Sequence, residues 1–522
     1  MKRIIAFILI LIICLSTVAC GGNTGGADVT LPSTSINDGV HIPGVGVEGH
    51  TDENSDKYCD ECGISVVTTF DFYAINDLHG KFVNSNNTVG VEGLTTYLKK
   101  SAASDDNPIF LSSGDMWQGG AESNLTKGAI VTDWMNAMGF ASMTLGNHEF
   151  DWGEDYVELN DSIANFPFLA INIYDKSTNK QVEYCQSSVV IECNGLQVGI
   201  IGAAGDNYSS ISSDKVEDIY FKTGYELTSL VKRESEKLRS EGVDIIVYSL
   251  HDGYSQSSSG VKDISNSALG SYYDIALSNG YVDIVFEGHT HRGYVLRDSH
   301  GIYHLQNSGD NGGVSHAELE YNFANGDCAV TEAEQVSSAY YGALAADPVV
   351  SDLLAKYDAV ISKASEVLGN NPSSLGGDAL RSLVAKLYFE KGFERWGDKY
   401  NIVLGGGFLT VRSPGYLRSG TLTYGNVQAV LPFENEIVLC SVKGRELSSK
   451  FINSSNSNYF VYLGEYGNSI KNNIDYNATY YLITDTYTSQ YAPNKLTVIE
   501  KYDSSTFACD LVAEHIKNGG LG

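Results

Sequence analysis

The chain has 522 residues, which is enough for two or three domains of roughly 150 residues each and for a sizeable hydrophobic core. Its 34 Lys and Arg residues against 64 Asp and Glu residues give a net charge of −30, which argues against electrostatic binding to nucleic-acid polymers. Hydrophobic residues make up 43% of the chain, so most of it is expected to fold.

The start of the chain has the pattern of a secretory signal peptide. Two basic residues precede an apolar run over residues 4–15, which is short for a membrane span, and small residues follow up to Cys20. The Thr-Val-Ala-Cys sequence at 17–20 resembles a bacterial lipobox, with Thr where Leu is usual. Residues 1–20 are therefore expected to be a lipoprotein signal peptide. Lipid modification of Cys20 would anchor the exported chain to the outer face of the bacterial cytoplasmic membrane. A plain cleaved signal is the alternative.

Residues 21–65 are rich in Gly, Thr, Ser, Asp and Asn, which is typical of a flexible linker. Within this segment His50, Cys59 and Cys62 could supply three zinc ligands, and the alternating acidic and amide residues at 52–56 resemble the start of a calcium loop. Both ligand sets are incomplete. The alternative is a solvated acidic linker with one local disulfide. Cys185 and Cys193 could close a short loop, but three other cysteines have no evident partners, so we do not expect disulfides to hold the fold together. These three are Cys328, Cys440 and Cys509.

Short apolar runs then alternate with amphipathic stretches, which predicts an α/β domain over residues 66–346 with at least some parallel strand pairing. Apolar residues at helical spacing over 225–242 predict a helix that covers the sheet. The predicted strands are residues 66–75, 108–114, 141–146, 166–173, 196–203, 243–250 and 282–288.

The pattern changes again after residue 346. Apolar residues at helical spacing follow Pro348 and predict a connecting helix over 347–369. A second domain, 370–522, is expected to begin with a helix near residues 379–393. A Gly-rich turn at 405–407 and short strands rich in Tyr and Thr should follow.

Five groups of metal-binding residue types stand where predicted strands of the first domain end. In open α/β sheets the carboxyl ends of strands line the ligand crevice, so these segments are expected to converge. The groups are Asp77-Leu78-His79, Gly114-Asp115, Gly146-Asn147-His148-Glu149, His251 and Gly288-His289-Thr290-His291.

The composition of these groups favours a two-metal phosphoesterase site. Carboxylate and amide oxygens combined with imidazoles suit Mn, Zn or Fe better than calcium or a structural zinc. In Asp-x-His the two side chains leave a strand on the same side, so both can bind one ion. Each motif alone has an ordinary alternative as a turn or a core residue. Their combination in this order does not.

Together the five groups match the calcineurin-like metallophosphoesterases. The added C-terminal domain makes the chain resemble the secreted bacterial 5′-nucleotidase family, which includes UDP-sugar hydrolases and 2′,3′-cyclic-nucleotide phosphodiesterases. The resemblance covers about residues 67–515. It implies an α/β fold, with a β-sandwich flanked by helices followed by a second α+β domain.

The resemblance also implies roles for individual residues. Asp77, His79 and His291 would bind a first divalent metal ion, Asn147, His251 and His289 a second, and Asp115 would bridge the two. His148 would be the catalytic histidine, oriented by Asp151.

The C-terminal domain departs from the family at the substrate site. Gly405, Gly406 and Gly407 match the nucleotide-binding segment, and Phe433 and Tyr487 match the two aromatic residues that stack on the base. The family Asn and Arg, however, fall on Leu404 and Leu409. Arg412 or Arg418 could substitute from a shifted position. The alternative for Phe433 and Tyr487 is that they are ordinary core aromatics.

These features predict an exported, lipid-anchored monomer that releases phosphate from nucleotides by attack of a metal-activated hydroxide on phosphorus. A 2′,3′-cyclic-nucleotide phosphodiesterase and a UDP-sugar hydrolase are near alternatives, and a sulfur-ester hydrolase is a further enzyme alternative. The alternative of another class is a non-catalytic surface protein that binds ligands. The expected partners are a small phosphate ester and, through the anchor alone, the membrane.

Overall fold

The computed structural model describes residues 51–84, 89–105, 107–265, 281–409, 411–412, 415–453, 459–491 and 496–521. The predicted signal peptide, Cys20 and His50 lie outside the described residues. All the described residues belong to one compact unit, Gly44–Gly522. No helix in this described part is both long enough and apolar enough to cross a membrane.

Two sheets form the centre of the N-terminal part. The first has the strand order β15 (Cys328–Ser337), β14 (Gly313–Asn322), β1 (Val67–Ile75), β2 (Ile109–Ser112), β3 (Ser142–Thr144) and β4 (Phe168–Leu169). The second has the order β10 (Val261–Asp263), β12 (Tyr294–Arg297), β13 (Tyr303–Gln306), β11 (Ile284–Glu287), β9 (Ile245–Leu250), β7 (Leu196–Ala203) and β6 (Ser188–Cys193).

The two sheets pack face to face because their strands alternate between two apolar faces. Phe70 and Phe72 of β1 point into the layer between the sheets, where the ring of Phe72 lies 6.2 Å from that of Phe286 in β11. Tyr73 and Ile75 of the same strand point to the opposite side and pack under helices. The predicted β-sandwich flanked by helices is confirmed.

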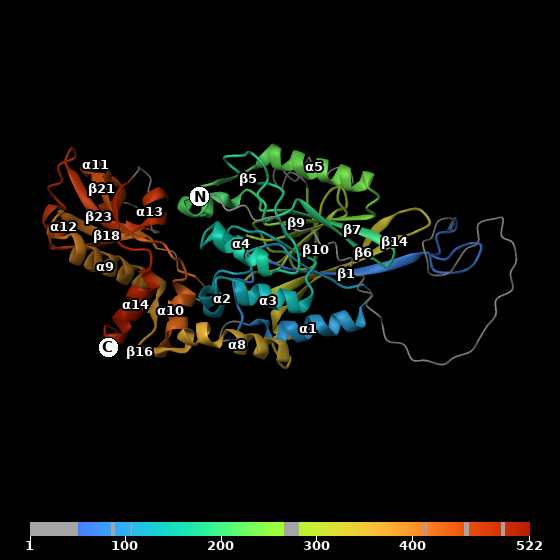
Figure 1. Cartoon of the computed structure of the whole chain (residues 1–522), viewed down its shortest axis with the longest axis horizontal. Helices are drawn as coiled ribbons and strands as arrows, with labels where there is room; N and C mark the ends of the chain where they lie inside the picture. The colour runs from blue at the N-terminus through green and yellow to red at the C-terminus, as the bar shows by residue number, and fades with distance from the viewer. Residues whose placement is uncertain are drawn as a thin grey trace, which may run out of the picture. The chain divides into compact units, whose positions relative to one another are not determined.

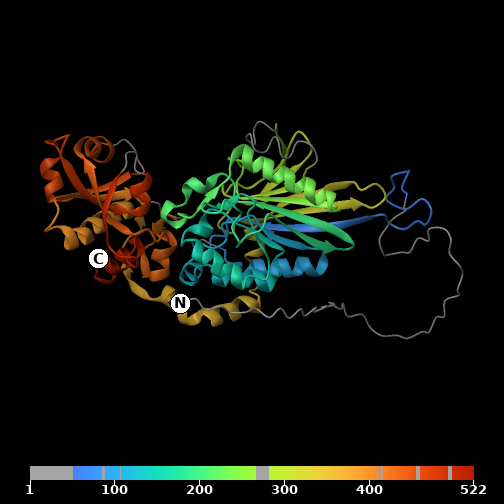
Figure 2. The same cartoon turned by 45° about the horizontal axis from the view of Figure 1, so that its top comes forward.

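Helices cover the outer faces of both sheets, as Figures 1 and 2 show. The helix predicted over 225–242 is α5, and its Leu227 and Val231 pack on the second sheet. The first sheet is covered by α1 (Val91–Ser104), α3 (Ala129–Met138) and neighbouring helices. The other helices of this part are α2 (Ala121–Thr126), α4 (Glu154–Ile163), α5 (Gly224–Ser240), α7 (Ser338–Tyr341) and α8 (Pro348–Ile361), and β5 (Ile173–Asp175) pairs with β8 (Ile219–Phe221).

All seven predicted strands are present, although residues 166–173 divide between β4 and the start of β5. The parallel pairs are β1 with β2, β2 with β3, β3 with β4, β7 with β9, β9 with β11, β11 with β13, and β10 with β12. Parallel strands bring their carboxyl ends to one edge of the sheet. The loops after β1, β2, β3, β9 and β11 therefore meet above the sandwich.

The C-terminal part has its own five-stranded sheet, with α9 packed on one face. Its strand order is β22 (Tyr459–Leu463), β18 (Ile402–Phe408), β23 (Thr479–Asp485), β21 (Ile437–Lys443) and β24 (Thr497–Lys501). Its helices are α9 (Gly377–Trp396), α10 (Tyr424–Val430), α11 (Gly444–Glu446), α12 (Glu465–Ile470), α13 (Thr486–Tyr491) and α14 (Ala508–Lys517), and the strand pairs β16 (Val367–Asn371) with β20 (Gly420–Thr423) and β17 (Leu375–Gly376) with β19 (Tyr416–Leu417) complete it.

Two predicted elements of this region were wrong. The connecting helix ends at Ile361 instead of reaching Gly369, because Val367–Asn371 form β16 and pair with β20. The Gly-rich turn at 405–407 lies inside β18. Glycine is needed there for close packing: a Cβ on Gly405 would lie 2.4 Å from the carbonyl oxygen of Ala385 in α9.

Residues 51–66 hold turn structure where a flexible linker was expected. Carboxylates of this segment accept hydrogen bonds from its own backbone, and Tyr58 forms an isolated bridge with Ser65. Cys59 and Cys62 are thiols here, as are the other five cysteines of the described part. Within the described residues, the groups with metal-ligand geometry lie elsewhere in the chain.

A buried histidine of β13, in the second sheet, lies between two acidic residues. His304 Nδ1 is 2.9 Å from Oε1 of Glu287, and its Nε2 is 3.7 Å from Oδ2 of Asp298. Burial alone would lower the pKa of His304, but the two carboxylates outweigh it and raise that pKa to about 9. The protonated form of His304 therefore contributes to stability.

We expect His304→Gln to destabilise the protein most at acidic pH. The contribution of a histidine with a raised pKa is fully present below the unfolded value of ~6.5 and is lost as the pH rises through the folded value. Because the folded pKa is about 9, the difference in free energy of unfolding from wild type should shrink towards alkaline pH. Denaturant unfolding of both proteins at pH ~6 and pH ~9.5 checks this. An equal difference at both pH values would contradict it.

Candidate metal centre and adjoining cavity

The five motif groups meet where the parallel strands of the sandwich end. Five of the seven predicted ligands lie in left-handed backbone conformations, which non-glycine residues seldom adopt. Such strain persists where the surrounding structure fixes it, and it concentrates at functional sites. The five residues are Asp77, His79, Asp115, His289 and His291, with φ angles of +49°, +49°, +56°, +70° and +54°.

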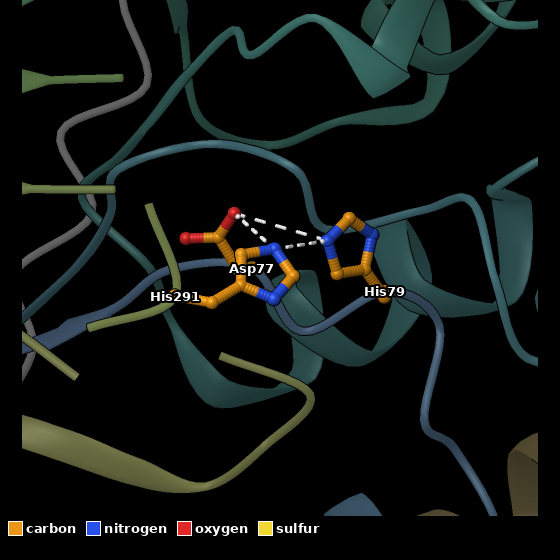
Figure 3. A group of neighbouring side chains, drawn as sticks. All are labelled: Asp77, His79 and His291. Atoms are coloured by element: carbon orange, nitrogen blue, oxygen red, sulfur yellow. Dashed lines mark hydrogen bonds and ion pairs between the residues drawn. The ribbon is translucent and has the colours of Figure 1, made fainter. Parts of the chain in front are cut away.

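The first cluster contains Asp77, His79 and His291 (Figure 3). The Nε2 atoms of His79 and His291 lie 3.0 Å apart, and Oδ1 of Asp77 is 3.1 Å from Nε2 of His291. Asp77 and His79 follow β1 of the first sheet, whereas His291 follows β11 of the second. The cluster therefore joins the two sheets.

The hydrogen bonds of His79 identify the nitrogen that is available as a ligand. Its Nδ1 lies 2.9 Å from the carbonyl oxygen of Gln118, and a carbonyl can only accept, so Nδ1 carries the proton. Nε2 of the neutral ring then carries the lone pair, which faces Asp77, His291 and the guanidinium of Arg412. A divalent cation fits this arrangement of facing acceptor atoms.

The second cluster contains Asp115, His251 and His289, with the amide of Asn147 beside it. His251 Nδ1 lies 2.8 Å from the carbonyl oxygen of Ser113, which again leaves Nε2 as the available ligand atom. This Nε2 is 3.1 Å from Oδ2 of Asp115 and 3.2 Å from Oδ1 of Asn147. His289 Nδ1 is 2.9 Å from the same amide oxygen.

Asp115 lies between the two clusters. Its Oδ2 is 3.1 Å from Nε2 of His251 and 4.0 Å from Nε2 of His79. Burial alone would lower the pKa of His251, but the Asp115 carboxylate outweighs it and raises that pKa to about 10. The buried carboxylates thus favour positive charge at this position, which is what a cation would supply.

Glu149 holds the loops of the centre together, a role that the sequence did not reveal. Its carboxylate accepts hydrogen bonds from the backbone N–H groups of Gly146 at 2.7 Å, Met116 at 2.8 Å and Asp115 at 2.9 Å. Glu149 belongs to the Gly-Asn-His-Glu motif, so its place in the sequence was a signal, but nothing in that motif indicated its partners.

His148 and Asp151 form the predicted pair at the edge of the centre. His148 Nδ1 is 2.7 Å from Oδ2 of Asp151, so Nδ1 donates to the carboxylate and Nε2 is left for other contacts. The rings of His148 and His79 lie 5.3 Å apart. The backbone N–H of His148 donates to Oδ1 of Asp115 at 2.8 Å, which ties this pair to the second cluster.

A cavity of about 480 Å³ adjoins the centre. His148, Asp151 and His291 line it on one side, and the predicted substrate residues Arg412, Phe433 and Tyr487 line it as well. The Arg412 guanidinium lies 5.7 Å from the ring centroid of Phe433, and its Nη1 is 3.1 Å from Nε2 of His79. Its Nε and Nη2 atoms are buried without a hydrogen-bond partner.

The other predicted substrate residues have different surroundings. The lining of this cavity does not include Gly405, Gly406 or Gly407, which pack within the C-terminal sheet. Leu404 is buried in the core of that sheet, whereas Leu409 lines the cavity. Arg418 is exposed and lines a separate cavity of about 510 Å³.

The geometry agrees with what the comparisons find. Residues 70–293 match the model of the calcineurin-like phosphoesterase family. These residues form a calcineurin-like phosphoesterase domain. The protein UshA of Yersinia enterocolitica is 26% identical over 416 residues, which cover 71% of this chain and 74% of UshA. A 5′-nucleotidase of Vibrio parahaemolyticus is 28% identical over 223 residues, which are 41% of this chain and 38% of that protein.

The fold is that of solved 5′-nucleotidase structures. The crystal structure of a 5′-nucleotidase precursor from Thermus thermophilus matches 86% of this chain and 96% of its own, with a TM-score of 0.66 and 18% identity. At that identity the match shows the fold, including the second domain. The resemblance to the 5′-nucleotidase family is confirmed, and the chain is a metal-dependent phosphoester hydrolase. Its fold implies divalent metal ions, for which the two clusters are candidate sites.

Proposed function

We propose that this protein is an exported di-metal phosphohydrolase that releases phosphate from nucleotides. The observation that carries the proposal is that the two ligand clusters, the His148–Asp151 pair and an aromatic-lined cavity adjoin one another. The 5′-nucleotidases among its relatives support a nucleotide as the substrate.

In this proposal each cluster holds one divalent ion. Asp77, His79 and His291 would bind the first ion, Asn147, His251 and His289 the second, and Asp115 would be shared. The mixture of nitrogen and oxygen donors suits Mn, Zn or Fe. When bound, the ions would lower the pKa of water and stabilise charge on phosphoryl oxygens.

The chain's own residues bind and orient the substrate. Arg412 has two nitrogens without a hydrogen-bond partner, Nε and Nη2, and would donate their N–H groups to phosphoryl oxygens. Phe433 and Tyr487 would contact the base. With its Nδ1–H held by Asp151, the doubly protonated ring of His148 would give its Nε2 proton to the leaving oxygen and become neutral.

The proposal includes a location and a division into domains. Export and a lipid anchor at Cys20 are supported by the signal-like first 20 residues. A catalytic domain over residues 66–346 and a substrate-binding domain over residues 370–522 are supported by the hydrophobic clusters, which separate near residue 350.

The first test is hydrolysis by the purified protein with Mn²⁺ present, measured as the formation of each product, because opening a cyclic diester or cleaving the pyrophosphate bond of UDP-glucose releases no inorganic phosphate. The substrates are AMP, 2′,3′-cyclic AMP, UDP-glucose and a generic aryl phosphate. We expect AMP to be preferred and Asp115→Ala to lose at least ~100-fold in rate, because the shared carboxylate is gone. Activity on the aryl phosphate alone would exclude a nucleotide as the substrate. No activity with any metal ion tried would favour a non-catalytic binding protein.

We expect His148→Asn to reduce kcat by ~10²–10⁴-fold, because a positioned proton donor contributes that much to a transfer reaction. The metal content should stay at the wild-type value, since His148 belongs to neither ligand cluster. Elemental analysis of the purified variant, alongside the rate, separates the two effects. Loss of bound metal together with activity would show that His148 acts as a ligand.

We expect Arg412→Ala to raise the KM for AMP by roughly 10–100-fold, because a hydrogen bond from a charged donor is worth about 1.5–3 kcal/mol. Arg418→Ala is the matched control: the two residues are six positions apart, and Arg418 lines the other cavity. Steady-state kinetics of both variants measure the difference. An unchanged KM in Arg412→Ala, or an equal increase in both variants, would exclude Arg412 as the phosphate-binding residue.

A further inference from the structure

The charges that line the adjoining cavity are unusual for a site that would hold more than one phosphate. Among the described residues that line it, Arg412 is the sole Lys or Arg. Its guanidinium reaches Nε2 of His79 in the first metal cluster at 3.1 Å. This cation is therefore placed to serve the phosphate that lies at the metal centre, and no other Lys or Arg among the described lining residues is placed to bind a second phosphate.

Four acidic residues line the same cavity, and three of them are balanced. Asp151 is bonded to His148, Asp310 lies 3.3 Å from the ammonium of Lys81, and Glu434 forms an ion pair with Lys127. The fourth is Asp485. Its hydrogen-bond partners are the backbone N–H of Thr488 at 2.7 Å, the Thr488 hydroxyl and the Tyr388 hydroxyl at 3.4 Å, all of them neutral groups.

Asp485 lies at the aromatic wall. It precedes Tyr487 by two residues, and Asp151, Asp485 and Tyr487 all line the cavity. Asp485 is 2% exposed, and burial raises its pKa to about 6, whereas the hydrogen bonds donated by Thr488 and Tyr388 favour its ionised form. It therefore offers a negatively charged hydrogen-bond acceptor beside Tyr487, which is proposed to contact the base.

The other lining residues include the uncharged polar residues Ser210, Ser212 and Asn435 and several apolar residues. Val384, Leu409, Leu431 and Ala508 line the cavity beside Asp485. A phosphate held against these side chains would lose its hydration without gaining a cation, and the Asp485 carboxylate would repel it.

On the basis of the proposed function, we infer that this cavity selects phosphate monoesters with a single phosphate and an uncharged leaving group that carries N–H or O–H donors, as nucleoside monophosphates do. Substrates that place a second phosphate in the cavity, such as nucleoside diphosphates and nucleotide sugars, are rejected. Asp485 is the specificity-determining residue, because it accepts from the donors of the leaving group and repels a second phosphate.

The test compares kcat/KM for AMP, ADP and UDP-glucose on the full chain with Mn²⁺ present. Each rate is divided by the rate of the same protein on an aryl phosphate, so that loss of folding or metal cancels. Wild type should prefer AMP over ADP and UDP-glucose by roughly tenfold or more. Asp485→Asn keeps the shape of the side chain and removes its charge, so the preference should fall at least about fivefold.

A second pair of variants tests the missing cation. Leu409→Arg adds a positive charge to the cavity wall and should also reduce the preference for AMP over ADP, whereas the uncharged Leu409→Met should not.

Three outcomes would overturn the inference. They are equal efficiency of wild type on AMP and ADP, an unchanged preference in Asp485→Asn, and turnover of the aryl phosphate without AMP. The last outcome would still show a phosphoester hydrolase and would exclude only the nucleotide as its substrate. Absence of activity on every substrate, including the aryl phosphate, would instead defeat the proposed function and the inference with it.

Discussion

The structure depends on acceptor atoms that converge at one buried place. Carboxylate oxygens of Asp77 and Asp115 face the Nε2 atoms of His79 and His251, and each of those rings is fixed by a carbonyl at its other nitrogen. Acceptors placed this close repel one another unless a cation lies between them. The left-handed backbone at five of the predicted ligands is a further cost. The rest of the domain must hold this arrangement in place.

The sandwich explains how that is possible. Each cluster takes residues from both sheets: Asp77 and Asp115 follow strands of the first sheet, and His251, His289 and His291 follow strands of the second. The large apolar layer between the sheets fixes the separation of these two sets of loops. The carboxylate of Glu149 then ties the loops after β2 and β3 to each other. Precise ligand placement is thus a result of sheet packing.

The strands and the metal-binding residues of the sandwich could be predicted from the sequence because short local patterns determine them. Strands of alternating or continuous apolar residues end at polar motifs, and parallel pairing brings those ends together. The errors arose where tertiary packing decides the conformation. Three consecutive glycines suggest a turn, but at Gly405 glycine is required because α9 lies against the strand. The helix predicted to Gly369 stops at Ile361 because the following residues gain more as a strand paired with β20.

The substrate side of the cavity shows a different limit. Position in the motif left Arg412 and Arg418 equally suitable as replacements for the missing arginine. The fold separates them, because residues 415–418 turn away from the cavity while Arg412 points to His79. Asp485 had no motif to mark it, and its importance follows from its surroundings: a carboxylate at the end of a core strand, next to Tyr487 and bonded only to neutral groups. Short sequence motifs therefore identify the residues of the metal centre. Selection of the leaving group depends instead on the charged residues that the folded cavity leaves without an ion-pair partner.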